Sequence, residues 1–172
     1  MFDLPGASEC LYMLSQTVEY ALRAMVHMAS LRSMEWTSSE AVASRTKVPR
    51  GYLSKLMRDL VIAGLVESQR GPKGGFRLAK PTTGISLLDV VKAVDPFKRI
   101  ESCPLGLPDH LNLCALHKRL DDAMAHVEHA FGVASLADVL RPHPGTGQCQ
   151  TLTAPALQQA SVEGGAPRGQ AS

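Results

Sequence analysis

Apolar positions in the first third of the chain recur with the period of an α-helix. After Ser15, a suitable N-cap, they fall at 18, 21, 22, 25, 26 and 29, which predicts a first helix. The run Thr37-Ser38-Ser39-Glu40 fits a capping box, with Thr37 capping a helix over 38–45. A third helix is expected from Pro49 to Gly64, a glycine that suits a left-handed helix end. Two short helices joined by about four residues are typical of a helix-turn-helix.

The stretch after Gly64 predicts a β-hairpin. Leu65–Arg70 and Phe76–Leu78 have the composition of two short strands, and the turn between them reads Gly-Pro-Lys-Gly-Gly. A phosphate-binding loop would instead lead into a helix and end in Gly-Lys-Ser/Thr, and a flexible linker would not need an apolar return arm. A hairpin directly after a helix-turn-helix predicts a winged helix.

The second half of the chain predicts an amphipathic helix, an irregular segment and a longer helix. Ser86 is a suitable N-cap for the first of these helices, and Pro96 stops it. Over 115–131 the apolar residues form one narrow stripe at coiled-coil-like spacing: Leu116, Leu120, Ala123, Val127 and Phe131. Such a stripe packs either on a partner or on its own domain, and its position outside a small winged domain favours dimerisation.

Positive charge is concentrated in one window of the chain. The whole chain carries a net charge of +2, but Arg45 to Lys80 contains nine Lys and Arg against two acids, which makes this window +7 and the remainder −5. A basic helix-turn-helix and hairpin indicate a surface for double-stranded DNA, against the alternative of a merely solvated basic face. The expected DNA contacts are the outward residues of the third helix and the hairpin: Arg50, Tyr52, Ser54, Lys55, Arg58, Arg70, Lys73 and Arg77.

The elements together predict a mainly α fold with a small β-hairpin, in which a winged helix-turn-helix domain precedes a long dimerisation helix. The expected divisions are an N-terminal extension (1–13), the DNA-binding domain (14–96), a cysteine-containing sensor loop (97–114), the dimerisation helix with a short capping helix (115–140) and a disordered tail (141–172).

Composition argues against several classes of protein. No apolar run approaches the roughly 18–20 residues of a membrane helix, and the N-terminus lacks the pattern of a secretory signal, so we expect a cytoplasmic protein without membrane contact. The four cysteines, at 10, 103, 114 and 149, then face a reducing compartment, which favours metal binding or redox sensing over structural disulfides. No nucleophile–base set or nucleotide motif stands in a suitable context, so the sequence does not indicate an enzyme.

The stretches "LSQTVEYALRAMVHMA", "YLSKLMRDLVIAGLVESQRGPKGGFRLAKP" and "ISLLDVVKAVD" occur in this order within about residues 13–140. Together they resemble the IscR/NsrR/CymR family of bacterial winged-helix regulators. The resemblance implies a homodimer with a long helix crossing between protomers, which binds a palindromic operator and usually represses transcription.

The resemblance also implies a ligand set. Many members hold an iron–sulfur cluster by three cysteines at roughly six-residue intervals, together with a histidine three residues after the last cysteine or a carboxylate on the first helix of the other protomer. Cys103 matches the first cysteine, Cys114 the third, His117 the histidine and Glu19 the carboxylate. The middle cysteine is absent, its place falling around Asp109-His110. Two cysteines, His117 and either Glu19 or His110 still make four ligands, which suits a 2Fe–2S cluster better than a 4Fe–4S cluster.

Three interpretations of the cysteines stay open: an iron–sulfur site, a thiol switch or zinc site, and a cluster-free member that merely retains its cysteines. The sequence therefore predicts a dimeric, DNA-binding repressor that senses redox state, nitric oxide or iron–sulfur status through the Cys103/Cys114 loop. The competing hypothesis is a cluster-free winged-helix regulator controlled by protein partnership or by thiol oxidation.

Overall fold

The computed structural model describes residues 14–31, 35–71, 74–103 and 113–141. The predicted extension 1–13, all of the predicted tail beyond Arg141, and Lys73, Asp109 and His110 lie outside the described residues. The described part contains, in order, α1 (Gln16–Ser30), α2 (Ser39–Thr46), α3 (Arg50–Ile62), β1 (Val66–Gln69), β2 (Gly75–Leu78), the 3-10 turn η1 (Thr82–Gly84), α4 (Leu87–Val94), α5 (Ala115–Val133) and α6 (Leu136–Leu140). This order confirms the mainly α fold with one small hairpin.

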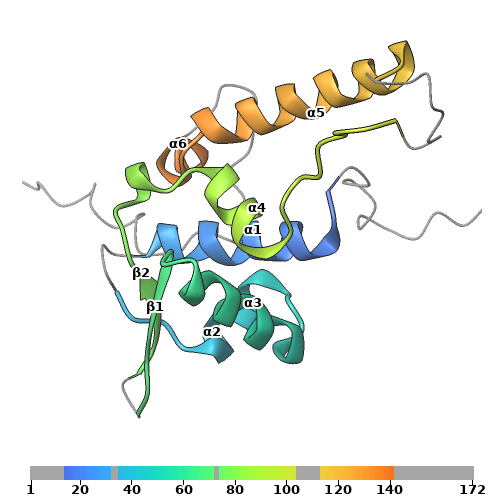
Figure 1. Ribbon diagram of the computed structural model, residues 1–172. Coiled ribbons are helices and arrows are strands. Elements are labelled where there is room, and N and C mark those ends of the chain that lie inside the picture. The colour runs from blue at the N-terminus through green and yellow to red at the C-terminus, as the bar shows by residue number, and fades with distance from the viewer. Residues whose placement is uncertain (1–13, 32–34, 72–73, 104–112, 142–172) are drawn as a thin grey trace, which may run out of the picture.

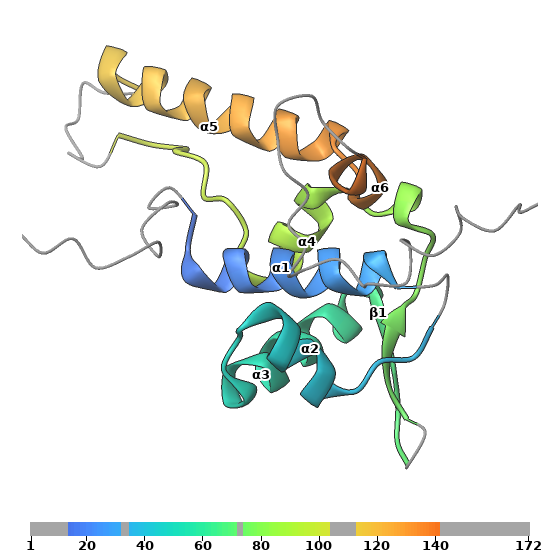
Figure 2. The same ribbon diagram turned by 180° about the vertical axis from the view of Figure 1, so that it is seen from behind.

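Helix α1 lies at the centre of the molecule. It runs between α2, α3 and the hairpin on one side and α4, α5 and α6 on the other (Figures 1 and 2). Ala21 and Ala24 on α1 are fully buried, and their small side chains let neighbouring helices approach closely. Met25, Leu56 of α3 and Leu136 of α6, each almost completely buried, fill the core around them.

The helix-turn-helix begins one residue later than the sequence predicts. Helix α2 starts at Ser39, and its N-cap is Ser38, whose hydroxyl accepts a hydrogen bond from the amide of Ala41. Thr37 is buried, and its backbone N–H and C=O both bond to the backbone of Phe76 at 2.8 Å. The predicted Thr37 capping box is therefore wrong. Two adjacent hydroxyls fit the pattern, and the long-range pairing of Thr37 with the hairpin decides between them.

Helix α3 ends as the sequence predicts. The Leu65 amide donates to the Leu60 carbonyl and the Gly64 amide to the Val61 carbonyl, both at 3.0 Å. These are the two bonds of a Schellman motif, and Gly64 has the φ of +69° that this motif requires. Because the helix stops so sharply, β1 begins directly beside α3.

The hairpin is tied to the core at its base and, through Thr37, at Phe76 of β2. Strands β1 and β2 are antiparallel, with Val66 opposite Leu78 at the buried base. Gly75 has a φ of +147°, and a Cβ at this position would lie 2.2 Å from the backbone oxygen of Thr37. Only glycine at position 75 therefore allows Thr37 and Phe76 to pair, and this pairing joins β2 to the segment before α2.

Helices α4 and α6 are capped in the same way. Ser86 and Ser135 each form a capping box with the aspartate three residues on, Asp89 and Asp138, which confirms the predicted cap at Ser86. The two caps are joined by a backbone bridge between Ser86 and Ser135. After α4 the chain runs without regular structure over 95–103 alongside α5 (Figures 1 and 2).

Helix α5 stands at the outer edge of the molecule, where it contacts α4 (Figure 1). It has 19 residues, and none of them is buried. Among the described residues, no helix combines the length and the apolar character needed to cross a bilayer.

Candidate DNA-binding surface and Cys–His site

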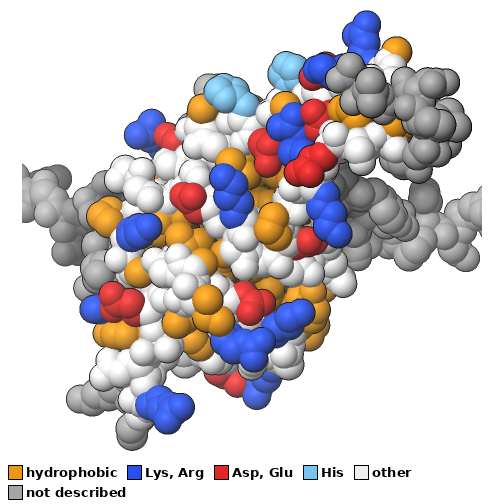
Figure 3. Space-filling view, in the orientation of Figure 1, with side chains coloured by type: hydrophobic (Ala, Val, Ile, Leu, Met, Phe, Trp, Pro, Cys, Tyr) orange, Lys and Arg blue, Asp and Glu red, His pale blue; other side chains and the backbone are white. Residues whose placement is uncertain are grey.

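The exposed face of α3 presents most of the predicted DNA contacts. Arg50, Ser54, Lys55 and Arg58 all point into solvent, while Leu53, Leu56, Met57 and Leu60 are buried on the opposite face. Arg50, at the first turn, is ion-paired with Glu40 of α2, and both side chains stay exposed. The space-filling view shows Lys and Arg side chains gathered over α3 and near the end of the hairpin (Figure 3).

Tyr52 does not share this outward orientation. Its hydroxyl is hydrogen-bonded to Thr17 of α1, and its ring meets the edge of the Tyr20 ring, with centroids 5.6 Å apart and planes at 79°. The side chain is half-buried and anchors α3 to α1. Helical phase alone predicted an outward residue, but α1 covers this part of α3. A DNA contact by Tyr52 stays a prediction.

The cations of the hairpin differ in how firmly they are held. Arg70 is exposed at the beginning of the turn. Arg77 is cross-strand paired with Glu67, its Nη2 atom 2.6 Å from Oε2, and its guanidinium lies 4.6 Å from the centre of the Trp36 ring. Because these contacts occupy both the charge and the flat face of the guanidinium, Arg77 stabilises the hairpin beside Trp36. Its predicted DNA contact is not tested by this arrangement.

A groove of about 490 Å³ separates α3 from the hairpin. Arg58 of α3 and Arg70 of the hairpin line it, together with Ser38 and Ser39 at the start of α2. These cations and helix-start hydroxyls are suited to phosphate groups, since they offer charge and hydrogen-bond donors.

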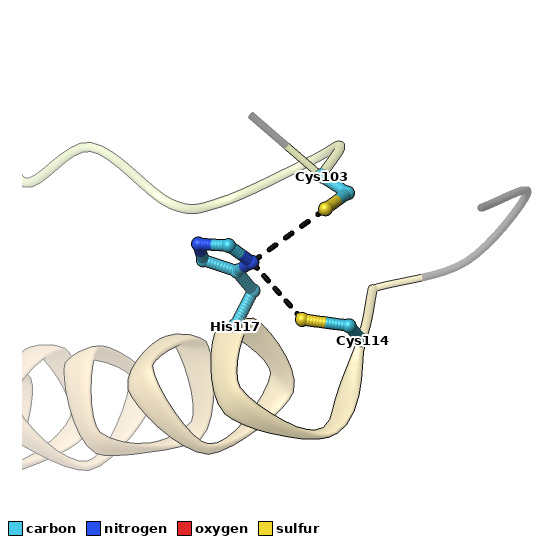
Figure 4. Close-up of side chains that lie close together, drawn as sticks. All are labelled: Cys103, Cys114 and His117. Carbon is cyan, nitrogen blue, oxygen red and sulfur yellow. Dashed lines mark hydrogen bonds between the residues drawn. The ribbon is translucent and has the colours of Figure 1, made fainter. Parts of the chain in front are cut away.

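Cys103, Cys114 and His117 come together at the beginning of α5. Cys114 precedes the helix, His117 lies in its first turn, and Cys103 ends the segment that runs alongside (Figure 4). The Nδ1 atom of His117 points between the two sulfurs, 3.1 Å from that of Cys114 and 3.7 Å from that of Cys103. All three ligand atoms lie within 4.8 Å of one another. The structure thus brings together three of the four predicted ligands.

The three donors lie close enough together to bind one metal ion. With metal–sulfur bonds of about 2.3 Å and metal–nitrogen bonds of about 2.0–2.1 Å, tetrahedral donors lie roughly 3.5–3.8 Å apart. The two sulfur–nitrogen separations, 3.1 and 3.7 Å, are close to this range, while the two sulfurs lie within 4.8 Å of each other. Thiolates and imidazole are ligands that suit iron and zinc. A two-iron cluster needs a fourth protein ligand beyond these three.

The position of Cys114 also favours its thiolate form. The amide of His117 in the first turn of α5, followed by that of Leu116, donates to the sulfur and lowers the pKa of the Cys114 thiol. Burial opposes this effect only in part. A cysteine at a helix N-terminus is the usual setting of a metal-binding or oxidisable thiol.

Glu19 stands apart from this cluster in a single chain. It lies on α1, where it is ion-paired with Arg23 one turn later. The predicted role of Glu19 placed it at the site of the other protomer, so the geometry of one chain does not test it.

The predicted dimerisation stripe on α5 is open at its N-terminal part. Leu116 is 64% exposed and Leu120 48% exposed, and Ala123 is exposed beside them. Val127 and Phe131, nearer α4, are half-covered. The Phe131 ring meets the edge of Phe97, with centroids 5.8 Å apart. An apolar stripe that the described residues leave open matches the pattern from which an interface was predicted.

Arg99 is a residue that the sequence did not single out. Its guanidinium bonds both oxygens of Asp121 on α5, at 2.6 and 2.7 Å, and also Glu128 at 3.2 Å. The Ile100 amide donates to Asp121 at 3.1 Å, and these bonds, led by that from Arg99, lower the pKa of Asp121 to about 2. The available signal was weak: one arginine four residues before Cys103, and an acid four residues after His117.

The protein family and the curated relatives that this chain matches are all described as transcriptional regulators. The profile of the Rrf2 family, described as "Iron-dependent Transcriptional regulator", matches residues 14–142. A protein of Aquifex aeolicus (strain VF5), described as an HTH-type transcriptional regulator, is 30% identical over 131 residues, which are 73% of this chain and 90% of that protein. The HTH-type regulator YwgB of Bacillus subtilis (strain 168) is 45% identical over 78 residues, covering 45% of this chain and 50% of that protein.

Solved structures share the fold. CymR, the global cysteine regulator of B. subtilis, superimposes with a TM-score of 0.62 at 24% identity, covering 75% of this chain and 96% of that chain. IscR of T. potens gives a TM-score of 0.64 at 23% identity, covering 83% of this chain and 96% of that chain. These similarities confirm the winged-helix fold predicted from the helices and the hairpin.

Proposed function

The chain belongs to the Rrf2 family of transcriptional regulators, and from this premise we propose that it is a homodimeric repressor whose operator affinity follows the chemical state of Cys103, Cys114 and His117. Membership in the family confirms the resemblance noted in the sequence and, with it, a regulator rather than an enzyme. The observation that carries the proposal is the meeting of the three side chains at the N-terminus of α5, the helix with the open apolar stripe.

In this proposal α3 and the hairpin bind the DNA. The exposed side chains of α3 enter the major groove, and Arg58 and Arg70, which both line the groove beside α3, bind phosphates. A homodimer presents two copies of this surface, and a two-fold protein favours a palindromic operator.

The signal acts through the Cys–His site. Cys103, Cys114 and His117 would hold an iron–sulfur cluster or a single metal ion, and a cluster would supply a redox-active centre at this position. Cys114 is directly followed by α5, so a change in the ligands displaces the first turn of the helix that carries Leu116 and Leu120. A displaced dimer helix changes the spacing of the two α3 helices and so the affinity for the operator.

A second candidate needs no bound group. The two sulfurs lie within 4.8 Å of each other, near enough for oxidation to a disulfide after a modest movement of the chain. In this form of the proposal the same thiols sense oxidants directly, and their oxidation displaces α5.

Anaerobic purification of the full chain, followed by an absorption spectrum and native mass spectrometry, separates the two candidates. Bound metal or cluster appears as added mass, and a cluster also as visible absorption, both of which are lost in a Cys103→Ser/Cys114→Ser variant and retained in Cys149→Ser. A chain of bare mass without visible absorption supports the thiol candidate.

DNA binding is tested by the salt dependence of affinity for duplexes selected from a random pool. Each lost phosphate contact should reduce the slope of log affinity against log salt by about 0.9. We expect this reduction for Arg58→Ala and Arg70→Ala, and no reduction for Lys92→Ala on α4. Equal slopes for all these proteins would contradict the proposed surface.

A further inference from the structure

The segment between α4 and Cys103 is fastened to α5 by a set of specific contacts. Phe97 packs edge-on against Phe131, and the Arg99 guanidinium takes both oxygens of Asp121. The backbone amide of Ile100 adds a further bond to the same carboxylate. Asp121 therefore holds the segment through the side chain of Arg99 and the backbone of Ile100, which precedes Cys103 by three residues.

The bonds of Arg99 and Ile100 to Asp121, with that of Arg99 to Glu128, form a clamp that shares one face of α5 with the Cys–His site. Asp121 follows His117 by four residues, and Glu128, the second partner of Arg99, follows seven residues later, so all three lie on one side of the helix. At about 100° per residue, this face is turned by roughly 110° from the stripe of Leu116, Leu120, Ala123 and Val127. The clamped segment thus lies along one face of the helix while the neighbouring face stays open.

The carboxylates that bind Arg99 are less exposed than that of a neighbouring ion pair on the same helix, while Arg99 itself is 39% exposed. The Asp121 side chain is 13% exposed and that of Glu128 25%, against 46% for Asp122, which pairs with Lys118 on the same helix. A two-pronged guanidinium–carboxylate pair fixes both distance and orientation, whereas a lysine pair fixes neither. Asp122 and Asp121 are neighbours in sequence, but only Asp121 restrains the segment that carries Cys103.

We propose that Asp121 is a positioning residue: through Arg99 and Ile100 it holds Cys103 over His117 and Cys114 and so sets how readily the two thiols act together. The inference rests on the proposed role of the Cys–His site, which it deepens. It also identifies the clamp as the connection by which a displaced Cys103 pulls on α5 one turn beyond His117.

The test measures the effective concentration of the two thiols in the full chain with Cys10→Ser and Cys149→Ser. The protein is equilibrated with reduced and oxidised glutathione. Cys103 and Cys114 lose two protons and two electrons to form their disulfide, and one glutathione disulfide is reduced to two glutathiones. We expect Asp121→Asn to lower the effective concentration on the order of tenfold, the scale typical of losing a partner that orients a ligand.

The matched control is Asp122→Asn, which removes an equal charge one residue away and should leave the equilibrium unchanged. Arg99 lies in the irregular segment before Cys103, so Arg99→Gln changes no helix residue. This variant should reproduce the effect of Asp121→Asn and replaces it if Asp121→Asn fails to fold. An unchanged equilibrium in both clamp variants, or an equal change in the control, overturns the proposal. If operator affinity of the parent protein does not depend on the thiol state, the proposed function is refuted. A shifted glutathione equilibrium in the clamp variants would still support the role of Asp121.

Discussion

The open stripe on α5 makes a quantitative prediction about self-association. Leu116 is 64% and Leu120 48% exposed, so together they leave about one whole leucine side chain uncovered in each protomer. Full burial of one leucine contributes about 1.5–3 kcal/mol. A symmetric interface covers both copies, and the two leucines should therefore contribute about 3–6 kcal/mol to dimer formation.

The perturbation is Leu116→Ala/Leu120→Ala, which removes most of this apolar surface without breaking the helix, since alanine has the highest helix propensity. Each 1.4 kcal/mol is a tenfold change in the dissociation constant, so we expect the dimer to weaken by at least about hundredfold. Sedimentation equilibrium over a concentration series measures this change directly.

Ile62→Ala is the control for the stripe. Ile62 is 78% exposed, more than either leucine, but lies at the end of α3, away from α5. Its removal should leave the dissociation constant unchanged. The reasoning is refuted if the double alanine variant associates as tightly as the parent protein, or if the Ile62 variant weakens association equally.

Two further predictions concern the hairpin and a helix cap. Gly75→Ala places a Cβ 2.2 Å from the Thr37 backbone oxygen. Backbone strain of this kind typically costs roughly 1–3 kcal/mol, so we expect operator affinity to fall about five- to 150-fold. Gly84→Ala, with open space around it, should leave the affinity unchanged, and a gel shift compares the two variants. The Ser86 amide lowers the pKa of Asp89, so this carboxylate stabilises the fold above its unfolded pKa of about 4, and that contribution should be lost as pH falls from there through the lower folded pKa. Measured by urea unfolding, the free energy of unfolding of Asp89→Asn should fall less at acid pH than that of the parent protein. An identical pH dependence of the two proteins would contradict this prediction.

Local signals in the sequence predicted most of the helices, including the end of α3 at Gly64 and the N-cap of α4 at Ser86. The glycine at 64 and the serine at 86 act through bonds to residues within five positions, so a short window contains the whole cause. The hairpin followed for the same reason, since its turn and both strands lie within 14 residues, from Leu65 to Leu78.

Errors arose where a distant element decides between local options. Thr37 and Ser38 are equally good caps by sequence, and pairing with Phe76 across the fold assigns the cap to Ser38. Tyr52 points outward by helical phase alone, yet Tyr20 of α1 lies beside it.

The candidate site was partly predictable. The spacing of Cys114 and His117 places them one turn apart, and the family resemblance added Cys103. The clamp joins Arg99 to Asp121 across 22 positions, and no periodicity or motif indicates such a pair. Its recognition required the path of the chain along α5.

The central claim is that the chemical state of Cys103 and Cys114 sets operator affinity. Fluorescence anisotropy of a labelled operator duplex, with the protein kept reduced under anaerobic conditions or oxidised with peroxide, tests it most directly. We predict that the affinity of the parent protein changes at least about tenfold, about 1.4 kcal/mol, between the two states, and that Cys103→Ser/Cys114→Ser abolishes the change. Equal affinity of the parent protein in both states would contradict the account.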